Sequence, residues 1–363
     1  MPFQPGFEQP EAEALLAMLA PMEGLAPPLP SPPLPLGWVK SFDSHSIGVF
    51  DNRWELWHDP APGSGRFALL VRGTVPKAGS IIDDLLSVMI PATGKIMGWD
   101  YRFAVDTAAG VHLGFALASL VILWDLTDGV LKRLPSLVPP GSEVYIAGHS
   151  QGAAIATLIR SYLAHTAAPP VPGCTYKTYT FALPKPGNAR YADEFNAEFV
   201  NPGMAYRVTN SLDWVPQSPL TLESFTDVNT PNPISVWFTA RLFLEPVHLA
   251  ISALRDAIHL AQVTRHKPQL DHLSQKLNGV PLATASAMGL PTDLPQILPS
   301  LDFESCGSPF TLIGRPGMNP DNPHDFFWQH HAAMYYLLLT GGSIPAIAAV
   351  GAAAIVAPDC EPS

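Results

Sequence analysis

The sequence predicts an α/β fold with a mostly parallel central sheet flanked by helices, and two observations lead to this class. Short β-rich runs alternate with helical runs along most of the chain, which is the pattern of parallel strands joined by crossover helices. Hydrophobic residues make up 47% of the 363 residues and charged residues only 14%, so the chain can bury a large core. The alternation breaks between about residues 216 and 308, which predicts a helical insertion or cap on the sheet.

The individual elements follow from hydrophobic periodicity and from turn residues. The predicted strands are 48–59, 66–73, 142–148, 175–183, 203–210 and 309–315, the first two being neighbours joined by a Pro/Gly turn. The predicted helices are 78–90, 110–134, 151–165, 188–199, 247–266 and 325–339. The run 110–134 is long and apolar enough to be expected as one buried helix.

The order of these elements divides the chain into five segments. They are a proline-rich N-terminal arm (1–40), the core (41–215), the insertion or cap (216–308), the continued core (309–342) and a C-terminal tail (343–363). The arm is expected to run extended into the fold or around it, because the prolines of PMEGLAPPLPSPPLPLG allow neither helix nor sheet to persist. The apolar part of the tail is too short and alanine-rich to predict a transmembrane span.

The charge balance excludes some classes of partner. With 31 acidic and 20 basic residues, the formal net charge is -11, which argues against nucleic acid or an anionic membrane surface. A transient contact with a neutral lipid surface stays open. The N-terminus has no basic start and predicts no secretory signal, but a trimmed secreted chain would look the same as a cytoplasmic one. Cys174, Cys306 and Cys360 are expected to be free thiols, although one disulfide remains open.

A candidate nucleophile lies in the sequence YIAGHSQGAAIATLI. Gly148, His149, Ser150, Gln151 and Gly152 spell G-x-S-x-G, at the point where a predicted strand ends and a predicted helix begins. This context is typical of the nucleophile elbow of α/β-hydrolases, which exposes the serine oxygen on a tight turn. The alternative is an ordinary strand-loop-helix joint with a serine cap. We take Ser150 as the predicted nucleophile.

A serine nucleophile needs a base and an acid, and in α/β-hydrolases they follow in the order serine, acid, histidine. Asp213 lies just beyond a predicted strand and is the predicted acid, although aspartate is also common in turns. Asp193, on a predicted helix, and Asp227, within the insertion, are weaker rivals.

The base is expected late in the chain. The candidate histidines are His248, His259, His266, His272, His324, His330 and His331. The first four lie in the predicted insertion, whereas His330 and His331 open an apolar, aromatic helix. We predict that one of this pair is the base and prefer His331. A metal site is not predicted, because no carboxylate or cysteine lies at ligand spacing from the pair.

Two N–H donors are needed for the developing oxyanion. The backbone of Gln151, directly after the nucleophile, is the first predicted donor. Thr74, which follows the strand run in LLVRGT, is the second and can add its hydroxyl. Taken alone, Thr74 would be an ordinary loop residue.

Five ordered motifs resemble the class 3 lipases, the fungal-type triacylglycerol lipase family that also includes feruloyl esterases. They are VRGT, VHLGF, AGHSQGAA, FALPKPGNARYADEFN and RVTNSLDWVPQSP. The resemblance covers about residues 66–220 and 324–340. It implies Ser150 as nucleophile, Asp213 as acid, and Thr74 and Gln151 as oxyanion donors.

The resemblance also implies a lid over the site, which here would be about residues 75–90. The family histidine usually lies four or five residues before an aromatic residue, which fits His331 and almost equally His330. This sequence departs from the family where Gln151 and Ala153 replace the usual leucine and glycine, and in the long gap between Asp213 and the histidine pair.

The expected activity is hydrolysis of carboxylic esters, with triacylglycerol as the favoured substrate and no metal or organic cofactor. A short-chain or aromatic-acid (feruloyl-type) esterase and an acyltransferase are alternatives within the same chemistry. A non-catalytic lipid-binding protein of the same fold is a further alternative, which an ordered triad disfavours.

Overall fold

The computed structural model describes residues 3–24, 29–47, 51–73, 88–96, 98–219, 221, 271, 280–290, 292–293, 295–298, 300–322 and 324–343. Most of the predicted insertion, the predicted helix 247–266, Thr74 and most of the tail lie outside these residues. The lid candidate, residues 75–90, also lies outside them up to residue 87. Its last two residues, Met89 and Ile90, belong to a strand. The five predicted segment boundaries therefore stay predictions.

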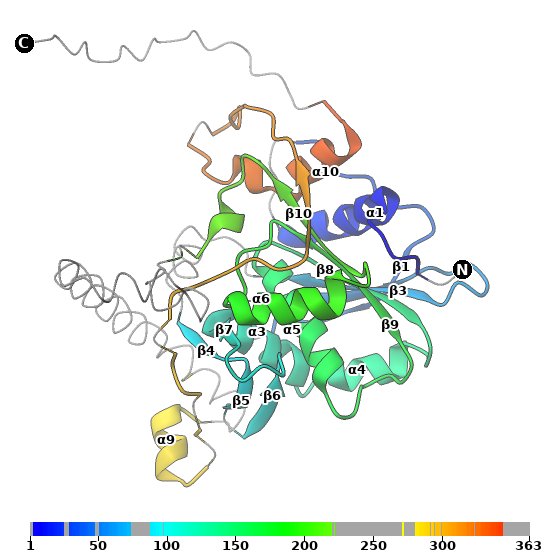
Figure 1. The fold of residues 1–363 in the computed structure, drawn as a ribbon. Helices are drawn as coiled ribbons and strands as arrows, with labels where there is room; N and C mark the ends of the chain where they lie inside the picture. Colours follow the sequence, from blue (N-terminus) through cyan, green and yellow to red (C-terminus); the bar gives the residue numbers. More distant parts are fainter. Residues whose placement is uncertain are drawn as a thin grey trace, which may run out of the picture.

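The central feature is a seven-stranded sheet with the order β1-β2-β3-β8-β9-β10-β11 (Figure 1). Its strands are β1 (Val39–Asp43), β2 (Arg53–His58), β3 (Arg66–Arg72), β8 (Glu143–His149), β9 (Thr175–Phe181), β10 (Ala205–Asn210) and β11 (Ser308–Leu312). β1, β2 and β3 pair antiparallel, whereas every pair from β3 to β11 is parallel. The predicted α/β class with a mostly parallel sheet is confirmed.

The register brings the carboxyl ends of the parallel strands to one edge. Arg72 at the end of β3 pairs with His149 at the end of β8, and His149 pairs with Phe181 at the end of β9. Loops that leave this edge therefore begin close together in space. In open α/β sheets this edge is where functional sites are built.

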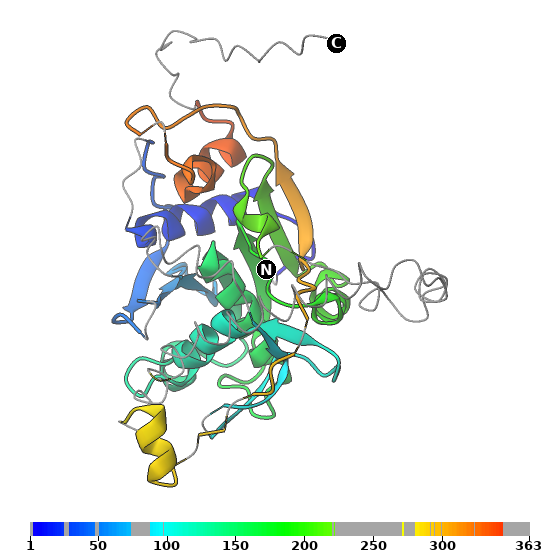
Figure 2. The same ribbon diagram turned by 90° about the vertical axis from the view of Figure 1, so that its left-hand side faces the viewer.

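Helices cover both faces of the sheet (Figures 1 and 2). One face carries α3 (Leu113–Trp124), α4 (Val130–Leu137), α5 (Gln151–His165), α6 (Ala189–Phe195) and the π-helical turn η2 (Asn196–Val200). The other face carries α1 (Gln9–Leu19), the 3₁₀ turn η1 (Ala20–Glu23) and α10 (Ala332–Thr340). Because successive strand residues point to opposite faces, Leu69 and Val71 join the first core and Ala68 and Leu70 the second.

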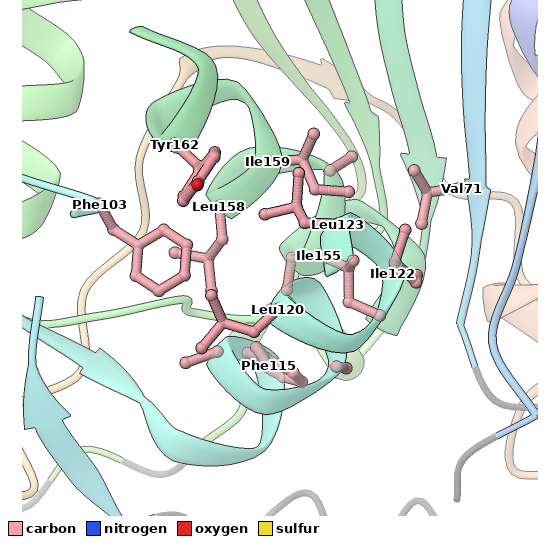
Figure 3. Close-up of a cluster of buried hydrophobic side chains, with 14 of the residues drawn as sticks. Val71, Phe103, Phe115, Leu120, Ile122, Leu123, Ile155, Leu158, Ile159 and Tyr162 are labelled. Carbon is pink, nitrogen blue, oxygen red and sulfur yellow. The ribbon is translucent and has the colours of Figure 1, made fainter. Parts of the chain in front are cut away.

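The packing of α3 against α5 is the centre of the first core (Figure 3). The figure labels Phe115, Leu120, Ile122 and Leu123 of α3 against Ile155, Leu158, Ile159 and Tyr162 of α5, with Val71 of β3 and Phe103 beside them. All these side chains are buried. This apolar contact fixes α5, and with it the residue that precedes α5, relative to the sheet.

The remaining elements surround this core. Outside the main sheet, β4 (Met89–Pro91) pairs with β7 (Gly110–His112), and β5 (Thr93–Ile96) forms a hairpin with β6 (Trp99–Arg102). Short helices are η3 (Val215–Gln217), α9 (Leu282–Ala287) and η5 (Trp328–His330). The end of the predicted insertion crosses this region, where Leu298 bridges Met89 and Glu304 bridges Gly187. None of the helices among the described residues combines the length and apolar character that a membrane crossing requires.

Two features differ from the sequence expectation. Residues 110–134 are not one helix, because the Asp125 carboxylate accepts the N–H groups of Thr127 and Asp128 and ends α3 in a turn. The predicted arm contains α1, whose apolar side chains are buried against the sheet. Cys174 and Cys306 are free thiols as expected, and Cys360 lies outside the described residues.

Candidate active site

Ser150 lies on a strained turn between β8 and α5. Its backbone has φ 58° and ψ −133°, a region that residues other than glycine seldom occupy. The N–H of Ser150 donates to the carbonyl of Phe181 at 2.9 Å, which ties the turn to the end of β9. The side chain therefore leaves the sheet at its carboxyl edge, between strand and helix, as the predicted nucleophile elbow requires.

The glycines around Ser150 allow three backbones to approach one another. A Cβ atom at Gly148 would lie 2.2 Å from the carbonyl oxygen of Gly152, and one at Gly152 would lie 2.3 Å from that of Val71. Neither position has room for a side chain. The G-x-S-x-G spacing is thus explained by packing of β3, β8 and α5 around the serine.

His330 connects Ser150 to Asp213 by hydrogen bonds. Nε2 of His330 lies 2.7 Å from Oγ of Ser150, and Nδ1 lies 2.8 Å from Oδ2 of Asp213. His330 is the last residue of η5, and α10 begins two positions later at Ala332. Serine, imidazole and carboxylate therefore form a continuous chain of hydrogen bonds, in the geometry of a serine hydrolase triad.

Asp213 is a buried carboxylate with three donors. Besides His330, its Oδ2 accepts the hydroxyl of Tyr335 at 2.7 Å, and its Oδ1 accepts the N–H of Val215 at 3.0 Å. Burial alone would raise the pKa of Asp213, but the adjacent His330 and these hydrogen bonds lower it below its ordinary value. The side chain is therefore held ionised beside the imidazole.

A second link joins the loops that carry Asp213 and His330. The amide of Asn210, at the end of β10, donates to the backbone carbonyl of Gln329 at 2.8 Å and to its side-chain oxygen at 3.0 Å. Asn210 is fully buried. The acid and the base are thus placed by the same strand end, over a sequence gap that contains the whole predicted insertion.

The preference for His331 over His330 is wrong on geometry. Nε2 of His331 lies 3.1 Å from Oδ2 of Asp325, which also accepts the side-chain amide of Asn319 at 2.8 Å. His331 has an extended backbone (φ −57°, ψ 137°) between η5 and α10, and its ring reaches Asp325 while that of His330 reaches Ser150. The alternative that the sequence left open, His330, takes this place.

Two of the weaker candidates lie among the described residues, and neither joins the site. Asp193 is exposed on α6, and His324 is exposed in the loop before η5. Asp227, His248, His259, His266 and His272 lie outside the described residues.

Of the two predicted oxyanion donors, only Gln151 lies among the described residues. Gln151 is the first residue of α5, where the N–H groups of the opening turn point out of the helix. Thr74 lies outside the described residues, but Gly73, which precedes it, packs against this turn. A Cβ atom at Gly73 would lie 2.6 Å from the backbone nitrogen of Gly152. The end of β3 and the start of α5 are therefore in direct contact beside Ser150.

One group of described residues has the spacing of a metal site, away from the triad residues. A nitrogen of His165 lies 3.6 Å from Glu194 and 3.2 Å from Glu198. However, the two oxygens of Glu194 accept the N–H groups of Val105 at 2.6 Å and Asp106 at 2.7 Å. The group is accounted for by hydrogen bonding and ion pairing within the fold.

Sequence reasoning missed two residues that contact the site. Tyr335 is one of the aromatic residues that follow the histidine pair, and its hydroxyl binds Asp213. Glu23 forms an ion pair with His149, the residue before Ser150, at 2.6 Å. No local signal marks Glu23, because it lies within a proline-rich run and meets its partner only in the folded chain.

Comparison with known proteins finds a family that the central part of the chain matches. The family described as lipase (class 3) matches residues 68–223. The secreted mono- and diacylglycerol lipase A of Penicillium cyclopium is 34% identical over 109 residues, which cover 29% of this chain and 33% of the relative. The secreted mono- and diacylglycerol lipase 1 of Fusarium solani is 32% identical over 115 residues, which cover 30% of each chain. The chain thus spans about a third of the length of these curated relatives.

A solved structure resembles a larger part of the chain. The crystal structure of M37 lipase aligns with a TM-score of 0.45 at 16% sequence identity, over 84% of this chain and 79% of that one. The matched family region contains Ser150, Asp213 and the oxyanion candidates but neither His330 nor Glu23.

Proposed function

We propose that the protein, whose residues 68–223 match the class 3 lipase family, hydrolyses carboxylic esters with Ser150, His330 and Asp213. The observation that carries the proposal is the pair of hydrogen bonds on the His330 ring, 2.7 Å to Ser150 and 2.8 Å to Asp213. A serine hydroxyl becomes an effective nucleophile when a positioned base accepts its proton, and this arrangement supplies that base.

The first half of the reaction forms an acyl-enzyme. Oγ of Ser150 attacks the ester carbonyl carbon while its proton passes to Nε2 of His330. Nδ1–H of His330 donates to Asp213, which fixes the required tautomer and stabilises the imidazolium as it forms. The carbonyl oxygen becomes an oxyanion and accepts the backbone N–H of Gln151, and Thr74 is proposed as the second donor. As the tetrahedral intermediate collapses, the imidazolium gives its proton to the leaving alcohol.

The second half uses water in the place of the serine. His330 accepts a proton from water, whose oxygen attacks the acyl carbon, and the second tetrahedral intermediate releases the carboxylic acid. The proton then returns from His330 to Oγ of Ser150. Every proton transfer in this sequence uses a group of the chain itself.

Lipid esters are the proposed substrate class, with triacylglycerol as the favoured example. Large apolar side chains are exposed on the loops that carry Asp213 and His330, among them Leu212, Trp214, Ile313 and Phe326. Trp214 and Phe326 are joined by a 3.0 Å hydrogen bond from the Trp214 indole to the Phe326 carbonyl. We call these four side chains the apolar rim. An exposed apolar patch is typical of a contact surface, and the net charge of -11 favours a neutral lipid surface over an anionic one.

The proposal is tested by hydrolysis of p-nitrophenyl esters with acyl chains of two to sixteen carbons. We expect activity to increase toward long chains and Ser150→Ala to lower kcat by about 10⁴-fold or more. Ser136→Ala, which changes an exposed serine on α4, is the matched control and should leave kcat unchanged.

The same measurement separates the alternatives. Activity confined to short or aromatic acyl groups would indicate an esterase, and ester formation with an added alcohol would indicate an acyltransferase. If the wild-type protein cleaves no ester and a serine-reactive phosphonate does not label Ser150, the hydrolase proposal fails and a lipid-binding role replaces it.

A further inference from the structure

Glu23 brings a carboxylate from the N-terminal arm to the active site. It is the last residue of η1, and its side chain is only 13% exposed. One oxygen lies 2.6 Å from Nδ1 of His149, and both oxygens lie 3.3 Å from the backbone nitrogen of Ala332. Glu23 lies 45 positions before the region that matches the lipase family, which begins at residue 68.

The two partners of Glu23 flank the reacting groups. His149 directly precedes Ser150, and Ala332 is the first residue of α10, two positions after His330. The His149 and His330 rings are 4.8 Å apart between centroids. One carboxylate therefore binds the strand that presents the nucleophile and the helix that follows the base.

The arm is held in place independently of Glu23. Glu11, on α1, accepts the hydroxyls of Tyr145 and Tyr179 at 2.7 Å each and pairs with the fully buried Lys177 at 2.7 Å. Figures 1 and 2 show α1 lying along the sheet beside α10. The position of η1 is thus set by a separate polar network, which leaves the Glu23 carboxylate to act on the site.

We propose that Glu23 is a positioning residue of the active site, which fixes His149 beside Ser150 and the start of α10 beside His330. In this arrangement the N-terminal arm completes an active site whose serine and aspartate belong to the family region. The inference rests on the proposed function, because it assigns Glu23 a role in the reaction of Ser150.

The charges of the pair are consistent with this role. Burial lowers the pKa of His149, but the Glu23 carboxylate outweighs burial and raises it above the ordinary value of 6.5. Burial likewise raises the pKa of Glu23, but His149 outweighs it and lowers that pKa below 4.5. The ionisable groups that act on the pair from packed elements are Asp213, His330 and His331, and the Tyr335 ring also faces His149.

The pH window of the pair follows from these directions. The Glu23 contribution to stability is present above pH 4.5 and is lost as pH falls through its lowered pKa. The His149 contribution is fully present below pH 6.5 and is lost as pH rises through its raised pKa. The coupling between the two side chains is therefore greatest between pH 4.5 and 6.5.

The test compares Glu23→Gln, His149→Asn, the double variant and Glu11→Gln in the full chain. We expect Glu23→Gln to lower kcat about tenfold to a hundredfold with KM changed less than about twofold, because small misplacements of reacting groups are costly. The rate of Ser150 labelling by a phosphonate should fall in parallel. The double variant should lose no more kcat than the more impaired single variant, because both substitutions break the same contact between Glu23 and His149. Glu11→Gln is the control for docking of the arm and should lower the Tm while kcat stays within about twofold of wild type.

A second readout measures the contact itself. The Tm coupling between Glu23→Gln and His149→Asn should be largest between pH 4.5 and 6.5 and should shrink above that window. If the arm had only a structural role, a pH-dependent coupling of the Tm values would not be accompanied by a parallel loss of kcat. If Glu23→Gln does not fold, His149→Asn carries the same test, because it removes the opposite charge.

The outcomes separate the inference from the proposed function. Wild-type kcat in Glu23→Gln, or equal kcat losses in Glu23→Gln and Glu11→Gln, would overturn the positioning role and leave the hydrolase intact. A wild-type protein that neither cleaves esters nor reacts with the phosphonate would overturn the hydrolase proposal and this inference with it.

Discussion

The Tyr335 hydroxyl donates a hydrogen bond to Oδ2 of Asp213 over 2.7 Å. The same oxygen faces Nδ1 of His330 at 2.8 Å, so the carboxylate receives two donors on one atom in a buried environment. Burial and the Asp213 charge raise the pKa of Tyr335 well above its ordinary value, so the hydroxyl stays a donor. Tyr335 thereby offsets the cost of burying the acid.

Tyr335→Phe should test this role, because it keeps the ring and removes only the donor. We expect a loss of about 1.5–3 kcal/mol in the free energy of unfolding, since a hydrogen bond to a charged group is broken. The pKa of Asp213 is lowered in the folded state, so its contribution is present above the ordinary value of 3.8 and is lost as pH falls through the folded pKa. In Tyr335→Phe this loss should begin at a higher pH. Urea unfolding between pH 3 and 7 measures the free energy of unfolding, and Tyr336→Phe, at a half-buried tyrosine, is the control. If the stability of both variants depends equally on acid pH, the Tyr335 hydroxyl does not stabilise the Asp213 carboxylate.

The two adjacent histidines should differ sharply in their effect on activity. His330→Ala removes the group that contacts both Ser150 and Asp213, and we expect kcat to fall by about 10⁴-fold or more. His331→Ala breaks the contact with Asp325 and the ring contact with Trp328, neither of which involves Ser150 or Asp213. We therefore expect less than about a tenfold loss in kcat and about 1 kcal/mol of destabilisation. Steady-state kinetics and urea unfolding of both variants provide the comparison. Equal losses of kcat would refute the assignment of His330.

The fold and most of the site could be predicted where local sequence determines structure. Helix α5 begins and ends at the predicted residues, because the glycines around Ser150 mark its start and its apolar periodicity is strong. Asp213 follows a strand whose end could be recognised from the sequence. These features depend on neighbours in the chain.

The features that sequence reasoning missed depend on distant contacts. The choice between His330 and His331 is decided by the direction of each side chain at the junction of η5 and α10, which periodicity does not fix. Helix α1 was hidden within a segment that proline dominates as a whole, although Pro10 lies in the first turn, where proline is tolerated. Glu23 acquires its partner only when the arm packs on the sheet.

The glycine after the nucleophile should resist even the smallest side chain. Gly152→Ala would place a Cβ atom 2.3 Å from the carbonyl oxygen of Val71, where two backbones meet. We expect about 1–3 kcal/mol of destabilisation or more from this overpacking, together with a loss of activity as Ser150 shifts. Gly317→Ala is the matched control, because the added atom would only make ordinary contact with the Trp328 indole. Thermal unfolding of the two variants should separate them, and an unchanged Tm in Gly152→Ala would show that the elbow is looser than these contacts indicate.

The apolar rim should govern action on lipid aggregates without affecting the chemistry. Phe326 is 80% exposed and lies four positions before His330, so Phe326→Ser removes apolar surface beside the site and leaves the core intact. We expect hydrolysis of emulsified triacylglycerol at low interfacial area to fall about five- to tenfold, which corresponds to partial burial of one aromatic side chain in lipid. Hydrolysis of a dissolved short-chain p-nitrophenyl ester should stay within about twofold of wild type, because the triad is untouched.

The control for this prediction is Leu126→Ser, which removes a side chain of similar exposure, 77%, in the turn after α3. It should leave both activities unchanged, since Leu126 is not part of the apolar rim. A parallel loss on dissolved and emulsified substrates in Phe326→Ser would mean that Phe326 supports the His330 loop instead of contacting lipid. If Leu126→Ser lowers hydrolysis of emulsified triacylglycerol as much as Phe326→Ser does, the effect depends on the total exposed apolar surface and not on the apolar rim.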